Sequence, residues 1–223
     1  MKIRLLIIPF TVFTLFGCGS MYQGAMEKMG ADVDKRETMI TRVEEARDAQ
    51  IEAKKQFQSA LEKFQNMVRF EGGDLEREYE ELKSTVQRCE ERTEDVRARL
   101  KGVEEVSADF FDEWRKDIQK YDSDELRDTS REKLENAKEK YESMMAAMRQ
   151  AKSRLGQTLI PFQDQVLYLQ NNLNTKSVEG LSGELENIRS DVDELVKVLE
   201  KSIKQTTDFL VAIDDERLPD TAE

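Results

Sequence analysis

The side chains in this 223-residue sequence that could do chemistry are two cysteines, Cys18 and Cys89, and a series of adjacent acidic pairs. There is no histidine, which excludes Ser-His-Asp and Cys-His catalysis, histidine-containing zinc and di-iron motifs, and an imidazole pH switch. The two carboxylates of an adjacent pair such as Glu44-Glu45 point about 100° apart on a helix, so they do not face each other as an acid–base couple. We therefore expect no catalytic activity, no metal site and no cofactor.

Cys18 stands at the end of an apolar segment that follows two basic residues, Lys2 and Arg4. This segment, residues 5–16, is too short for the roughly 20 residues that cross a bilayer as a helix, and it is typical of an export signal. It ends in Leu15-Phe16-Gly17-Cys18, which resembles the lipobox of bacterial lipoproteins. The resemblance implies that the signal peptide, residues 1–17, is removed and that the Cys18 thiol carries diacylglycerol. A further acyl chain, such as palmitate, can then modify the new amine. A plain secretory signal and an uncleaved anchor are the alternatives.

The lipid would attach the protein to a membrane without a transmembrane helix, because each buried methylene contributes about 0.8 kcal/mol. In bacterial lipoproteins the residue after the cysteine directs sorting, and Gly19 implies the outer membrane, with the body in the periplasm. The chain is acidic, with 35 Lys+Arg against 47 Asp+Glu and a net charge of -12. Nucleic acid is therefore not an expected partner, and anionic lipid heads repel the body. Residues 18–34 are predicted to be a tether.

Four long segments then show apolar or small residues at alternating steps of four and three, the pattern of helices that pack along a narrow seam. They cover residues 39–67, 75–114, 126–173 and 178–213. The third contains a step of four followed by another four beside Gly156 and Pro161, which predicts a kink or local unwinding. Gly180 and Gly183 weaken the first turns of the fourth.

Short breaks separate these segments. Gly72-Gly73 ends the first, and Asp74 is predicted to cap the second. Asp122 is predicted to cap the third, a role that we prefer to calcium binding with Asp124 and Asp128 because the glycine and final glutamate of a calcium loop are missing. The fold class predicted is all-α, with long antiparallel helical hairpins forming an up-down-up-down four-helix bundle or coiled coil over residues 35–213. An acidic, flexible tail, residues 214–223, follows.

The connections place two turns at the end of the bundle far from Cys18. We expect this end to be the partner-binding tip, formed by Gly72, Gly73, Asn171, Asn172 and Asn174. The narrow seams suit closure within one chain or pairing with a second copy as a homo-oligomer.

Two further features have a structural and a functional interpretation. Cys89 lies on a seam, which favours a buried, unreactive thiol over an intermolecular disulfide. Phe110 and Trp114 also lie on a seam, which favours packing against the tether or the third helix over contact with lipid heads.

Several strings together resemble an uncharacterised family of bacterial lipoproteins, domain of unknown function 2959. They lie at residues 21–30, 42–50, 72–75, 111–114 and 164–174, and the similarity spans nearly all of the chain after Cys18. The resemblance implies a lipoprotein of the Gram-negative envelope. It supplies no activity and no functional residues.

The sequence therefore predicts an outer-membrane-anchored periplasmic lipoprotein with a structural or scaffolding role and protein partners that it does not identify. The alternatives are a periplasmic holdase chaperone and an adaptor or activator of an envelope enzyme. A holdase would suppress aggregation of unrelated proteins, whereas a scaffold would bind one or a few folded partners.

Overall fold

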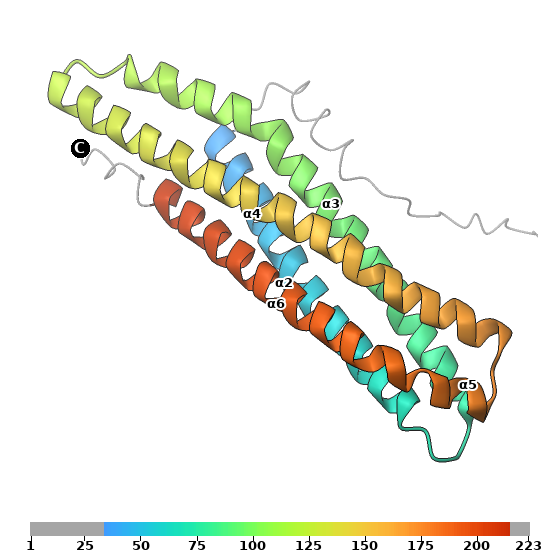
Figure 1. The fold of residues 1–223 in the computed structure, drawn as a ribbon. Coiled ribbons are helices and arrows are strands. Elements are labelled where there is room, and N and C mark those ends of the chain that lie inside the picture. The colour runs from blue at the N-terminus through green and yellow to red at the C-terminus, as the bar shows by residue number, and fades with distance from the viewer. Residues whose placement is uncertain (1–33, 215–223) are drawn as a thin grey trace, which may run out of the picture. The chain divides into compact units, whose positions relative to one another are not determined.

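The fold is all-helical in a computed structural model that describes residues 34–214 (Figure 1). The predicted signal peptide, Cys18, nearly all of the tether and the acidic tail lie outside these residues. The helices are α2 (Lys35–Val68), α3 (Leu75–Ile118), α4 (Asp124–Asn171), α5 (Thr175–Gly180) and α6 (Ser182–Asp214). Residues 34–214 contain no strand, so the predicted all-α class is confirmed.

The four long helices alternate in direction and form an antiparallel bundle. Both α2 and α4 pack against α3 and α6, so each long helix has two neighbours. The α2–α3 turn and the α4–α5 turn lie together at one end, which we call the tip (Figure 1). The start of α2 and the end of α6 lie toward the opposite end. The 48 residues of α4 correspond to a helix of about 72 Å.

The predicted seams form the core. Every predicted seam position of α2, from Met39 to Met67, is buried, and so is every one of α3 from Tyr79 to Trp114. The prediction is wrong for Leu126, which is 52% exposed. Steps of four and three counted back from Leu134 lead to Ser130 and then residue 127, so Leu126 falls off the seam.

The core consists of two clusters. Near the tip, Phe162 of α4 lies between Phe57 and Phe64 of α2, with edge-on ring centroids 6.4 and 6.1 Å away. In the other cluster the rings of Tyr141 and Phe209, 5.9 Å apart, join α4 to α6. Such pairs add to the free energy gained by burying apolar area.

Buried polar residues lie near the boundary between the two clusters. They include Gln50, Ser202 and Thr206. Gln50 donates through Nε2 to the Ala46 carbonyl at 3.1 Å, and Thr206 donates to the Ser202 carbonyl at 2.9 Å. The apolar core is therefore not continuous along the bundle.

The helix boundaries correct three predictions. Ser123, rather than Asp122, caps α4, since its Oγ accepts from the Leu126 backbone N–H at 3.3 Å. Helix α4 continues through Pro161, so of the predicted kink or local unwinding the unwinding is wrong. The fourth predicted helix is divided at Leu181 into α5 and α6, because the glycines on either side make this stretch a poor helix former.

Candidate functional site: the bundle tip

Backbone conformation explains the two glycines in the α2–α3 turn of the tip. Gly72 has φ of 150° and Gly73 has φ of 119°, values that residues with a side chain rarely adopt. Asp74 then starts α3, because its Oδ1 accepts from the Arg77 backbone N–H at 3.1 Å. The predicted cap is confirmed, and the glycines have a structural role in ending one helix and starting the next.

The asparagines of the tip also complete helix ends. Asn171 and Asn172 donate from Nδ2 to the carbonyls of Leu167 and Tyr168, at 2.9 and 3.0 Å. Asn174 Oδ1 accepts from the Ser177 backbone N–H at 3.0 Å and caps α5. All three asparagines are exposed. The tip is therefore a well-defined pair of turns whose surface offers amides and backbone groups to a partner.

An ion pair holds α2 to α3 just below the tip. Lys63 Nζ lies 2.7 Å from Glu81 Oε2. This hydrogen bond is the main reason why the pKa of Glu81 is lowered and that of Lys63 is raised. Both residues stay charged at neutral pH, so the pair fixes the helices and has no proton to exchange.

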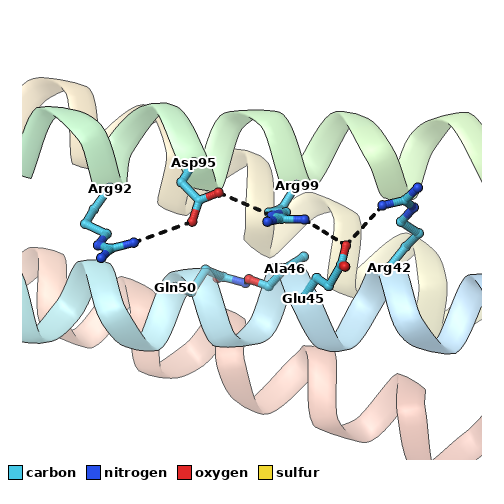
Figure 2. Close-up of polar contacts among 7 residues, drawn as sticks. All are labelled: Arg42, Glu45, Ala46, Gln50, Arg92, Asp95 and Arg99. Atoms are coloured by element: carbon cyan, nitrogen blue, oxygen red, sulfur yellow. Dashed lines mark hydrogen bonds and ion pairs between the residues drawn. The ribbon is translucent and has the colours of Figure 1, made fainter. Parts of the chain in front are cut away.

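Further along the same two helices, five charged residues form what we call the charged ladder (Figure 2). Its members, in spatial order, are Arg92, Asp95, Arg99, Glu45 and Arg42. Arg99 is central, with Nε 3.2 Å from Asp95 and Nη1 2.9 Å from Glu45. Because Glu45 lies on α2, this contact joins two helices. Of the adjacent residues Glu94 and Asp95, the first pairs with Arg97 and the second with Arg99.

Arg36 joins three helices toward the end opposite the tip. Its guanidinium lies 4.8 Å from the centre of the Trp114 ring of α3 and donates to the Ile213 carbonyl of α6 at 2.8 Å. This contact supplies positive charge to the last turn of α6, which has no basic residue of its own. Sequence reasoning missed Arg36, because its partner Ile213 is 177 residues away.

The two residues predicted to pack at this end do so. Phe110 and Trp114 are both buried, and Trp114 Nε1 donates to Ser130 Oγ of α4 at 3.3 Å. Packing against the third long helix is thus confirmed for Trp114.

Cys89 is fully buried, as its seam position predicted. Its Sγ lies 3.5 Å from the Gln56 carbonyl, and burial raises the pKa of the thiol to about 12. A thiol in this state is neither a nucleophile nor a disulfide partner at neutral pH.

Two other kinds of site have no candidate within residues 34–214. No group of three or more Cys, Asp or Glu side chains there could hold a metal ion. None of the helices in this part of the chain has a stretch both long and apolar enough to cross a membrane.

An open cleft of about 350 Å³ lies between α2 and α6, away from the tip. Its lining residues are Glu37, Ile40, Glu44, Arg47, Thr207, Leu210 and Val211. The polar groups belong to three charged side chains of mixed sign and one threonine, so the cleft has no arrangement specific to one ligand.

These features define a class of protein, an all-α antiparallel bundle whose two turns meet at an exposed tip. Residues 22–213 match the family described as protein of unknown function (DUF2959), and the chain belongs to that family. No curated protein and no solved structure matches the chain.

Proposed function

We propose that this protein is a lipoprotein of the bacterial outer membrane that acts as a non-catalytic scaffold in the periplasm. The observation that carries the proposal is Cys18, which ends a short apolar segment after Lys2 and Arg4 in a lipobox-like sequence. Acyl chains on this thiol would anchor the protein by burial of their methylenes.

The position of the start of α2 in the bundle supports the proposal that the tip is held away from the membrane. Residue 35 starts α2 in the half of the bundle away from the tip, so the 34 residues of α2, about 51 Å, separate that point from the turns at the tip. The packed core and the charged ladder make the body suitable for holding a partner at a distance.

Mass spectrometry of the processed protein tests the anchor. We expect a mass that corresponds to a chain beginning at Cys18 with diacylglycerol and a further acyl group, and processing that globomycin blocks. Cys18→Ala should abolish both, whereas Cys89→Ala, which changes the other cysteine, should leave them intact. An unmodified Cys18 thiol in the processed protein would contradict the proposal.

Photo-crosslinking in intact cells tests the scaffold. Glu71 and Lys176 are suitable positions for the crosslinker because both are exposed and neither requires the backbone conformation of Gly72 and Gly73. We expect one or a few folded partners from these positions, and none from Asp122 at the opposite end. Equal recovery of many unrelated proteins would instead indicate a holdase.

A further inference from the structure

The outward face of α4 near the tip differs from the rest of the surface. Residues 155–175 contain a single charged side chain, Asp164, in a chain of which 37% is charged. Within the same stretch Ile160 is 56% exposed, Leu167 is 58% exposed and Tyr168 is 44% exposed. Only Leu126 and Val211 are other large hydrophobic residues exposed among the residues that the structure describes.

These side chains follow a second heptad pattern, on the side of α4 that faces away from the core. We call it the outer seam; its members are Ser153, Gln157, Ile160, Asp164, Leu167 and Asn171, all exposed. The steps alternate between four and three, which is the spacing that another helix can follow. The outer seam extends over about five turns, or roughly 27 Å.

The negative charge of Asp164 favours a different protein, rather than a second copy of this chain, as the partner of the outer seam. In a symmetric pairing of two outer seams, centred between Ile160 and Leu167, the two Asp164 carboxylates would face each other. Like charges opposed in this way are destabilising, and two acidic chains, each with a net charge of -12, repel each other further. Asp164 forms no ion pair within residues 34–214. A basic side chain of the bound protein could therefore form an ion pair with it.

We propose that the outer seam binds an amphipathic helix of another protein, with a lysine or arginine between two apolar residues that are one heptad apart. The apolar residues would pack on Ile160 and Leu167, and the cation would pair with Asp164. This inference rests on the proposed scaffold function, and it identifies the surface and the class of partner.

Two synthetic helical peptides test the proposal in titrations of the full-length protein. Both contain two leucines one heptad apart in a neutral background of alanine and glutamine. The first has a lysine between the leucines and the second has a glutamate. We expect the lysine peptide to bind about fivefold more tightly, as for an exposed ion pair replaced by a repulsive one. Equal binding of the two peptides, or binding of neither, would overturn the proposal.

Variants of exposed residues locate the binding surface without disturbing the core. Leu167→Gln should weaken binding of the lysine peptide, and Asp164→Asn should remove the preference for lysine over glutamate. Leu126→Gln is the matched control, because Leu126 is a similarly exposed leucine on α4 outside the outer seam. If Leu126→Gln weakens binding as much as Leu167→Gln, the site is not the outer seam.

Analytical ultracentrifugation tests the alternative that a second copy of this chain binds the outer seam. A concentration-dependent dimer that Leu167→Gln abolishes would overturn the proposal in favour of self-association. The outcome for Cys18 is measured separately by mass. An unmodified Cys18 would contradict the proposed lipid anchor but not the proposed binding site on the outer seam. Equal binding of the two peptides by a protein with a lipidated Cys18 would contradict only the binding site.

Discussion

At the scale of single residues, Cys89 illustrates how burial suppresses thiol chemistry. Its pKa rises from 9.0 to about 12 because burial disfavours the charged thiolate. At neutral pH the thiolate fraction is therefore about a thousandfold smaller than in an exposed cysteine. In a Cys18→Ser chain, we expect Cys89 to react with Ellman's reagent only when the protein unfolds. Rapid labelling of the folded protein would contradict this burial.

The same pKa predicts a dependence of stability on pH. Because the folded-state pKa lies above the unfolded-state value, the unfolded chain releases the proton first. The stability contributed by the neutral thiol is fully present below about pH 9 and is lost as the pH rises toward 12. Thermal unfolding should show a steeper loss of Tm above pH 9 in the natural protein than in Cys89→Ala.

Gly156 and Gly73 should respond to substitution by alanine in opposite ways, because only Gly73 has a backbone conformation that requires glycine. Gly156 lies inside α4, and a Cβ there would have no neighbour within 4 Å, so Gly156→Ala should raise the free energy of unfolding by about 0.5–1 kcal/mol. Gly73→Ala should lower it by about 1 kcal/mol or more, because φ of 119° strains any side chain. Urea denaturation measures both changes in the free energy of unfolding. Changes of the same sign would contradict the conclusion that the backbone requires glycine at residue 73 but not at residue 156.

At the scale of helices, the charged ladder gives a matched pair of variants on α3. Arg99 reaches Glu45 on α2, whereas Arg97 pairs only with Glu94 on its own helix. We expect Arg99→Ala to cost about 1 kcal/mol and Arg97→Ala about 0.3 kcal/mol, with the larger loss reduced by salt. Urea denaturation at low and high ionic strength measures this difference, and equal losses would show that the ladder does not hold α2 to α3.

The helices and their buried faces were predictable because the seam spacing depends only on the helical repeat. The exceptions depend on local competition or on contacts between distant residues. Ser123 and Asp122 are adjacent capping residues, and only the backbone geometry selects between them. Arg36 and Ile213 are 177 residues apart, so no local pattern shows their hydrogen bond. The exposure of the outer seam likewise follows from which face of α4 meets the core.

At the scale of the whole bundle, the two core clusters meet near Gln50. This side chain is 1% exposed, and its Oε1 has no hydrogen-bond partner within residues 34–214. We expect Gln50→Met to raise the free energy of unfolding by about 0.5–1 kcal/mol, because removing the unpaired, buried Oε1 outweighs the loss of the hydrogen bond from Nε2 to the Ala46 carbonyl.

The matched control is Gln56→Met. Gln56 also lies on α2, but its Nε2 donates to the Thr85 carbonyl of α3 at 3.3 Å. This substitution removes an existing hydrogen bond and should lower the free energy of unfolding by about 0.5–1 kcal/mol. Denaturant unfolding compares the two, and a loss of stability in Gln50→Met would mean that Gln50 is satisfied in solution.

The contacts of Arg36 have a mechanical consequence. A pull on the chain at residue 35 is passed at once to the end of α6 and to Trp114 on α3. If the tip is held, the force loads antiparallel helices in shear along their length, and many contacts must break together. Without these contacts, the first turn of α2 would unfold under force one hydrogen bond at a time. Arg36 therefore makes the start of α2 resistant to tension.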